Sequence, residues 1–328
     1  MAAITLDRIG KEGVENAEKN QRYIDKGKSL RNLRGNSLDK SDCAVVIAAG
    51  PSLHRVNVAT QLKSYRFDGA IVATESAMRY CLKQGIIPDL VVSLDPHAKR
   101  IVRWFGDPDL TVEDLKQDDY FSRQDMDQAF SDELRANDEM LELLDKHGKN
   151  IRIALATSAS DAVVKRSLEV GMDVYWWNPM YDDPSTPNSV TMSLYKKNAL
   201  PCLNAGGNVG AACWMMAHGV LGKRHVAVTG MDFSYYADTP HKNTQYYYEA
   251  IALVGEENLE KFFIKIFNPH LNQWFYTDPA YMWYRNIFLE MAADAECTTY
   301  NCTEGGILFG ENINFVKLKE FLVGEACR

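Results

Sequence analysis

The stretch CAVVIAAGPS, residues 43–52, fixes the start of the fold, because seven apolar residues lead directly into a glycine, a proline and a serine. A short apolar run that ends in turn residues is typical of a strand buried on both faces. Similar runs recur at residues 70–73, 90–94, 151–156, 174–177 and 225–229. We therefore expect a series of buried strands.

Helical patterns lie between most of these runs, notably at residues 76–84, 159–170 and 209–218. Alternation of strands and helices predicts an α/β fold with a Rossmann-like, doubly wound, mostly parallel sheet. We place this nucleotide-binding core at residues 36–240. Around it we expect a helical N-terminal arm (1–35) packed on the core or on another subunit, an acidic helical insertion (about 107–147), and an aromatic, helical C-terminal portion (241–328) that completes the site.

The net charge of −8 is unevenly distributed. Residues 107–146 hold 14 acidic and 4 basic residues, a balance of −10, so the rest of the chain carries about +2 (−8 minus −10). An acidic segment of this kind need not repel a nucleotide bound elsewhere. No basic stripe is present, which argues against nucleic acid as a ligand.

Other features of composition narrow the class of protein. No run approaches the roughly 20 apolar residues that span a bilayer, so we expect a cytoplasmic protein without a membrane span. The seven cysteines are scattered and form no Cys-x-x-Cys pair, which favours free thiols and argues against a zinc site.

Polar, turn-like residues follow several of the expected strands. In an open α/β sheet, ligands bind outside the carboxyl ends of the strands, so we expect these residues to converge on one crevice. They are Ala49, Gly50, Pro51 and Ser52; Thr74, Glu75 and Ser76; Asp95 and Pro96; and Gly230 and Asp232.

The turn at Gly50 is a candidate phosphate site. Glycine lets the backbone approach a ligand closely, and amides at the start of a helix face phosphate oxygens. The alternative is an ordinary connection between a strand and a helix. The absence of Gly-x-Gly-x-x-Gly after this strand excludes a dinucleotide fingerprint.

Two further candidate binding sites each have a structural explanation as the alternative. Gly206, Gly207 and Asn208 open an apolar helix, which gathers free amides into an anion site unless the glycines only permit close helix packing. Asp95 is suited to a ribose hydroxyl or to Mg²⁺, unless the Asp-Pro turn only caps the next segment.

Asp232, Tyr235, Tyr236 and His241 form the candidate catalytic group. Phenol groups hydrogen-bond a phosphate leaving group, and a histidine that titrates near neutrality takes a proton from an acceptor hydroxyl.

Taken in order, a series of motifs resembles the motility accessory factor family, whose domain is shared with 6-hydroxymethylpterin diphosphokinase-like proteins. The resemblance runs from about residue 33 to residue 310 and rests on residues 49–53, 85–89, 93–96, 206–209, 230–235 and 301–306. It implies a flagellin glycosyltransferase that uses an activated nonulosonic (sialic-like) acid. It also raises Glu304 and Gly305 to candidate pocket residues.

A second similarity is to bacterial sialyltransferases that use a CMP-activated sugar. It implies that Gly50, Pro51 and Ser52 cradle the nucleotide and that Gly207 lies by its base or ribose. Tyr235 or Tyr236 would assist departure of the phosphate, and His241 would be the base. Ala49 and Asp95 each replace an asparagine of those enzymes, and an acidic Asp95 invites a metal ion.

The first functional hypothesis is therefore transfer of a nonulosonic acid from a CMP-sugar to a serine or threonine hydroxyl of a protein such as flagellin. The alternative is a Mg²⁺-dependent diphosphokinase that acts on 6-hydroxymethylpterin with ATP, with Mg²⁺ on Asp95 and Asp232. A third class is a nucleotide-binding or assembly protein without turnover. The sequence leaves a homo-oligomer open.

Overall fold

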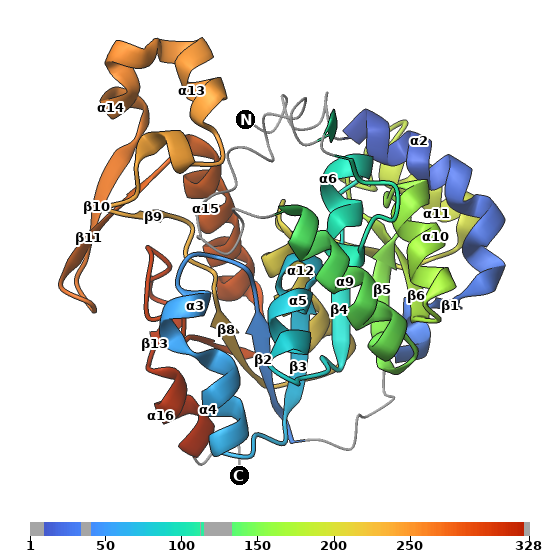
Figure 1. Cartoon of the computed structure of the whole chain (residues 1–328), viewed down its shortest axis with the longest axis horizontal. Coiled ribbons are helices and arrows are strands. Elements are labelled where there is room, and N and C mark those ends of the chain that lie inside the picture. The colour runs from blue at the N-terminus through green and yellow to red at the C-terminus, as the bar shows by residue number, and fades with distance from the viewer. Residues whose placement is uncertain (1–9, 34–40, 112, 115–132, 325–328) are drawn as a thin grey trace.

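The computed structural model describes residues 10–33, 41–111, 113–114 and 133–324 (Figure 1). The strands are β1 (Lys28–Ser29), β2 (Cys43–Ile47), β3 (Ala70–Thr74), β4 (Leu90–Ser93), β5 (Arg152–Ala156), β6 (Asp173–Pro179), β7 (Cys202–Leu203), β8 (His225–Thr229), β9 (Tyr235–Tyr236), β10 (Ile264–Asn268), β11 (Gln273–Thr277), β12 (Thr298–Asn301) and β13 (Ile313–Phe315). The α-helices are α2 (Lys11–Lys19), α3 (Leu53–Val56), α4 (Val58–Ser64), α5 (Glu75–Lys83), α6 (Ala98–Val102), α9 (Glu133–His147), α10 (Asp161–Glu169), α11 (Val190–Asn198), α12 (Val209–Met215), α13 (Tyr247–Val254), α14 (Leu259–Phe262), α15 (Pro279–Asp294) and α16 (Leu318–Val323).

The central sheet has the strand order β1-β6-β5-β4-β3-β2-β8-β12-β13, with β7 paired to β6. The pairings within this sheet are parallel. Helices cover both of its faces (Figure 1). The predicted Rossmann-like α/β fold is confirmed.

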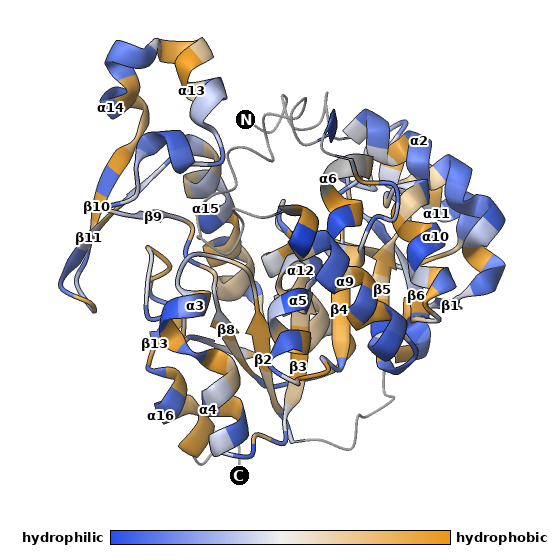
Figure 2. Ribbon diagram, viewed as in Figure 1, coloured by the Kyte–Doolittle hydropathy of each residue, from blue (hydrophilic) through white to orange (hydrophobic). Residues whose placement is uncertain are grey.

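Alternate residues of β2 face two separate cores. Ala44 and Val46 pack in the cluster that includes Trp214 of α12 and Phe288 of α15. Val45 and Ile47 pack in the opposite cluster, with residues of α3, α4, α5 and α16. A strand buried on both faces requires a continuous apolar sequence, which explains the apolar run at residues 43–49. Figure 2 shows the same contrast between apolar strands and amphipathic outer helices.

The direction of winding changes at β2. Strands β3, β4, β5 and β6 follow one another on one side of β2, whereas β8, β12 and β13 lie on its other side. In doubly wound sheets, ligands bind at the carboxyl ends of the strands where the order reverses. The topology therefore directs attention to the carboxyl ends of β2 and β8.

The N-terminal arm covers a different part of the same edge. Asn20 Nδ2 donates to the carbonyls of Thr157 (2.9 Å) and Ala159 (2.7 Å), just past β5. Asn16 Nδ2 donates to Ser158 O at 2.9 Å. The described part of the arm thus packs on the core, while residues 1–9 and 34–35 of the predicted arm lie outside the described residues.

The acidic insertion is described only in part. Residue 112 and residues 115–132 lie outside the described residues, and residues 133–147 form α9. Within the described ranges, no helix is long and apolar enough to cross a membrane.

The C-terminal portion is helical only in part, which corrects the expectation of a helical segment. Besides α13 to α16 it contains β12 and β13, which extend the central sheet. It also contains β10 and β11, which pair antiparallel with each other, and β11 pairs with β9. The aromatic residues from which we predicted packed helices lie partly on these short strands. We call residues 235–277, which form β9, α13, α14, β10 and β11, the appendage; it projects at the upper left of Figure 1.

The thiol prediction holds for five cysteines and fails for one. Cys81, Cys202, Cys213, Cys297 and Cys302 are free. Cys43, by contrast, is disulfide-bonded.

Replacing Asn20 by alanine is expected to lower the free energy of unfolding by about 1–3 kcal/mol, because two carbonyls lose their buried donor. Urea unfolding measures this value. Gln21→Ala is the matched control, because Gln21 Nε2 bonds only Ala17 O within the arm, and it should change stability by less than about 0.5 kcal/mol. Equal effects of the two substitutions would contradict the role given to Asn20.

Candidate functional site

Hydrogen bonds of the backbone and of side chains connect the segments that follow β2 and β8. Gly50 N donates to Gly230 O at 2.9 Å. Ser52 Oγ donates to Asp232 Oδ2 at 2.8 Å, and Ser52 N donates to the same oxygen at 3.3 Å. A Cβ on Gly50 would lie 2.3 Å from both Gly230 O and Asp232 Oδ2. Only glycine therefore permits this approach of the two strand ends.

These bonds change the interpretation of the Gly50 turn. The amides of Gly50, Ser52 and Leu53 all donate within the protein, and Pro51 has no amide proton. The expectation that amides of this turn face a phosphate is therefore wrong for these four positions. Gly50 and Pro51 instead line a pocket.

Asp232 is a buried carboxyl with one unsatisfied oxygen. Burial raises the pKa of Asp232 to about 7, against the opposing effect of the hydrogen bonds from Ser52. Its Oδ1 has no hydrogen-bond partner among the described residues. Near neutral pH the group is therefore poised between a proton donor and a proton acceptor.

Tyr236 and Gly305 lie on the other side of this carboxyl. A Cβ on Gly305 would meet the Tyr236 hydroxyl at 2.6 Å and Asp232 Oδ1 at 2.9 Å. The guanidinium carbon of Arg55 lies 3.6 Å from the centroid of the Tyr236 ring. Burial is the largest cause that raises the pKa of Tyr236 well above its ordinary value, so this phenol stays protonated. Residues from after β2, β8 and β12 thus meet around Asp232.

Tyr235 points elsewhere. Its side chain is fully buried, and its hydroxyl donates to Asp278 Oδ2 at 2.9 Å. Asp278 Oδ1 in turn accepts the amides of Ala280 and Tyr281 at the start of α15. We therefore assign Tyr235 to the packing of the appendage, and of the two predicted phenols Tyr236 is the one beside Asp232.

His241 also lies in the appendage. Its ring stacks on Phe263, with centroids 4.5 Å apart, and meets Tyr276 edge-on at 5.2 Å. Partial burial lowers the pKa of His241, which favours the neutral imidazole that a general base requires. Both of these aromatic partners belong to the appendage.

The residues after β3 include a helix cap, Thr74, and a buried carboxyl, Glu75. Thr74 Oγ1 caps α5 by accepting Ala77 N at 3.2 Å, and it lies 3.0 Å from the Ser76 hydroxyl. Glu75 is buried, and burial, with a smaller effect of Asp95, raises its pKa to about 8. Glu75 Oε2 has no partner in the described structure. Glu75 is therefore protonated at neutral pH.

The Asp-Pro turn follows the simpler alternative in its observed bonds. Asp95 Oδ1 accepts the amide of His97 at 2.9 Å, and Pro96 O accepts Asn16 Nδ2 at 3.1 Å. Among the described residues, no group of three or more His, Cys, Asp or Glu side chains gathers to hold a metal.

The Gly206–Gly207 loop packs against α15. A Cβ on Gly207 would lie 2.9 Å from the Trp283 ring and 3.0 Å from the Tyr284 ring, and one on Gly206 would lie 2.9 Å from Met291 Sδ. Both glycines have positive φ. Close helix packing thus explains both glycines. Gly207 nevertheless stays exposed, and Asn208 Oδ1 caps α12 by accepting Ala211 N at 2.9 Å.

Glu304 turns away from the Asp232 cluster. Its Oε1 accepts the amide of Leu318 at 3.1 Å and so holds the start of α16. Of the Glu304–Gly305 pair, only Gly305 contacts the site residues.

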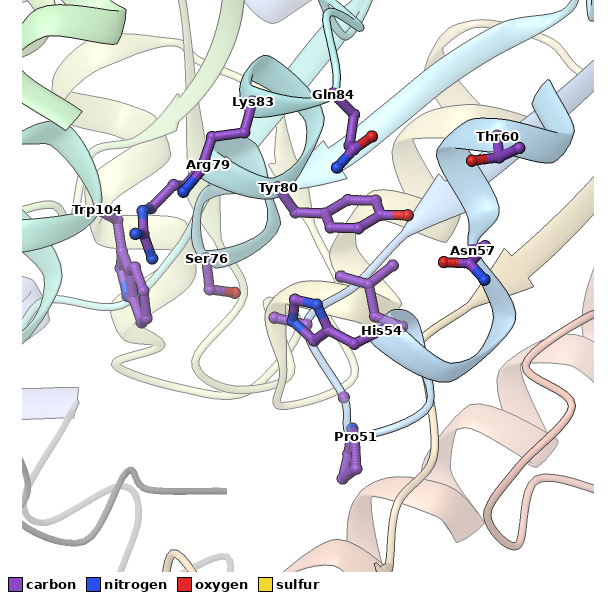
Figure 3. Close-up of a pocket in the computed structure, with 13 residues that line it drawn as sticks. Pro51, His54, Asn57, Thr60, Ser76, Arg79, Tyr80, Lys83, Gln84 and Trp104 are labelled. Carbon is purple, nitrogen blue, oxygen red and sulfur yellow. The ribbon is translucent and has the colours of Figure 1, made fainter. Parts of the chain in front are cut away.

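A pocket of about 310 Å³ opens beside the Gly50 turn, between α3–α4 and α5 (Figure 3). Four predicted residues line it: Ala49, Gly50, Pro51 and Ser76. The other lining residues were not predicted: Leu53, His54, Asn57, Thr60, Arg79, Tyr80, Lys83, Gln84 and Trp104. The spacing of Ser76, Arg79, Tyr80 and Lys83 places them on one face of the helix expected at 76–84, which is a signal that the sequence contained.

The chain is similar to known proteins in two comparisons. The model of the family described as 6-hydroxymethylpterin diphosphokinase MptE-like matches residues 15–106, which is 92 of 328 residues. Among solved structures, a Maf glycosyltransferase from Magnetospirillum magneticum AMB-1 is similar at 16% identity and a TM-score of 0.49. That alignment covers 85% of this chain and 34% of the other, so this chain spans about a third of that protein's length. None of the curated proteins matches.

The predicted resemblance to the MptE-like domain is thus confirmed over residues 15–106. This range includes the Gly50 turn, the residues after β3 and the Asp95–Pro96 turn. Asp232, Tyr236 and Gly305 lie outside it.

Replacing Glu75 by glutamine is expected to flatten the pH dependence of stability. The folded pKa of about 8 lies above the ordinary 4.5, so the wild-type protein loses stability as pH rises through 8, at about 1.4 kcal/mol per pKa unit. Between pH 5 and pH 9 the variant should lose at least about 2 kcal/mol less than the wild type. Chemical unfolding at the two pH values measures this difference, and Glu15→Gln, on the exposed side of α2, is the control. Parallel losses in wild type and Glu75→Gln would refute a protonated Glu75.

Proposed function

We propose that the chain is a nucleotide-dependent transferase, and specifically a glycosyltransferase that moves a nonulosonic acid from a CMP-sugar to a serine or threonine hydroxyl of a protein. The observation that carries the proposal is the Ser52–Asp232 hydrogen bond, which closes the carboxyl ends of β2 and β8 at the point where the winding reverses. The match of residues 15–106 to the MptE-like family supports it.

In this proposal the donor nucleotide lies across Gly50, Asp95 and the exposed Gly207. The acceptor oxygen attacks the anomeric carbon while the bond from that carbon to the phosphate oxygen breaks. Negative charge develops on the departing phosphate, and hydrogen-bond donors aimed at it lower the barrier. Tyr236 and the protonated form of Asp232 are the donors that this chain offers beside the Gly50 turn.

The acceptor hydroxyl must lose a proton during the same step. His241 is the proposed base, because its pKa is lowered and its imidazole is half-exposed. Its place in the appendage means that the acceptor would bind between the appendage and the sheet edge. A protein acceptor such as flagellin, a cytoplasmic location and a homo-oligomer remain predictions.

The second candidate is a diphosphokinase that transfers diphosphate from ATP to 6-hydroxymethylpterin, and the description of the matching family favours it. Mg²⁺ would then shield the phosphate charges, with Asp95 as the protein ligand. Since the described residues offer no cluster of three metal-ligating side chains, most ligands would have to be phosphate oxygens and water, as is usual for Mg²⁺.

Thermal-shift measurements distinguish the two candidates. A ligand that binds the folded state raises Tm in proportion to the logarithm of its concentration over Kd. We expect CMP to stabilise the protein more than ATP, with or without Mg²⁺. Stronger stabilisation by ATP that depends on Mg²⁺ would favour the diphosphokinase, and no shift with any nucleotide would refute a nucleotide-dependent enzyme.

His241→Ala tests the proposed base. Loss of a general base lowers turnover by about 10²- to 10⁴-fold, while the Tm shift produced by CMP should persist. His270→Ala is a matched control, because His270 also stacks on a phenylalanine, Phe315, at 4.5 Å. Transfer assays with a CMP-sugar compare the two variants, and equal turnover in both would remove His241 from the mechanism.

A further inference from the structure

The lining of the pocket has a charge that contrasts with the rest of the protein. The chain has a net charge of −8, yet the lining residues include Arg79 and Lys83 and no aspartate or glutamate. The lining also contains hydrogen-bonding groups without a charge, among them Asn57 and Ser76. A cavity with this lining selects for an anionic ligand.

Arg79 and Lys83 converge on a single point. They lie four residues apart on α5 and extend side by side from it in Figure 3. Both bind the same oxygen, Glu139 Oε2: Arg79 donates from Nε at 3.1 Å and from Nη2 at 2.5 Å, and Lys83 Nζ donates at 2.9 Å. Three charged N–H donors aimed at one oxygen are the arrangement in which proteins hold phosphate and carboxylate anions.

The Arg79 side chain is largely buried and is paired with a carboxylate. Its side chain is only 13% exposed, whereas Glu139 is 30% and Lys83 is 47% exposed. A guanidinium cannot lose its proton, so its partial burial is tolerated only with a paired charge. Glu139 meets this need from α9, whereas the pocket opens on the α5 side.

We propose that Arg79 and Lys83 form a binding subsite for a phosphoryl group of a small-molecule ligand, and that Glu139 occupies this subsite when the ligand is absent. The ligand's phosphoryl oxygens replace the carboxylate on the two cations. Tyr80 and Trp104 supply flat surfaces beside the subsite. The volume of about 310 Å³ admits a ligand about the size of a nucleoside monophosphate.

The subsite goes beyond the proposed transfer, because it lies along α5 and away from Asp232 and Tyr236. The pocket also reaches Gly50 and Pro51, so a ligand held by its phosphoryl group at α5 presents its other end at the carboxyl end of β2. The subsite exists whether the transferred group is a sugar or a diphosphate, and its test uses neither substrate.

Isothermal titration with inorganic pyrophosphate tests the subsite on the full chain. We expect Arg79→Gln to weaken binding at least tenfold and Lys83→Gln to weaken it severalfold. Glu139→Gln should tighten binding severalfold, because a competing carboxylate is removed. A Glu139 that only ties α5 to α9 predicts the opposite result, unchanged or weaker binding. Lys165→Gln is the matched control, because Lys165 is paired with Asp161 at 2.7 Å on α10, outside the pocket.

Several results would overturn the proposal. Unchanged affinity in both Arg79→Gln and Lys83→Gln, or no binding to the wild type, would overturn the proposal, as would a preference for succinate over pyrophosphate in a parallel titration. Should Arg79→Gln fail to fold, the more exposed Lys83 and Glu139 variants decide. A positive result here together with no response to CMP would refute the proposed function while leaving the subsite intact.

Discussion

The close approach of the carboxyl ends of β2 and β8 is the constraint on which the rest of the site depends. The bond from Gly50 N to Gly230 O is possible because neither residue carries a Cβ, since a Cβ on Gly230 would lie 2.0 Å from Ala48 O. The same approach buries Asp232 beside Ser52. Burial raises the pKa of this carboxyl, although the hydrogen bonds from Ser52 lower it. Gly305, which follows the neighbouring strand β12, packs against this carboxyl. Three glycines thus create one buried, titratable group.

Strands buried on both faces could be predicted from sequence, while strands that bury polar residues could not. The six apolar runs correspond to β2, β3, β4, β5, β6 and β8. Strand β12 escaped prediction because its residues are Thr298, Thr299, Tyr300 and Asn301. Its polar atoms are buried because residues outside the strand satisfy them: Trp214 Nε1 donates to Thr299 Oγ1, and Asn301 Nδ2 donates to Leu308 O. Those partners are known only from the fold.

At the site, the sequence identified the types of residue but not the directions in which their side chains point. Sequence reasoning selected both Tyr235 and Tyr236, but successive side chains of a strand point to opposite faces. Tyr235 therefore pairs with Asp278, at the start of α15, whereas Tyr236 lies beside Asp232. Only the pairing of β9 with β11 decides which phenol points where. The Gly206–Gly207 loop was similarly ambiguous, since an anion site and a close contact both require glycine, and the presence of α15 explains the contact.

Charge was the least informative property at the level of the whole chain. The net value of −8 suggests a protein that avoids anions, and even the local count places the acidity in one segment without saying what that segment touches. Helix α9, which lies in the described part of that segment, contributes Glu139 to the two cations of α5. A carboxylate drawn from the most acidic part of the chain therefore neutralises the most cationic part of the pocket. Because that pairing is electrostatic and only partly buried, an anion that binds Arg79 and Lys83 has to compete with the Glu139 carboxylate.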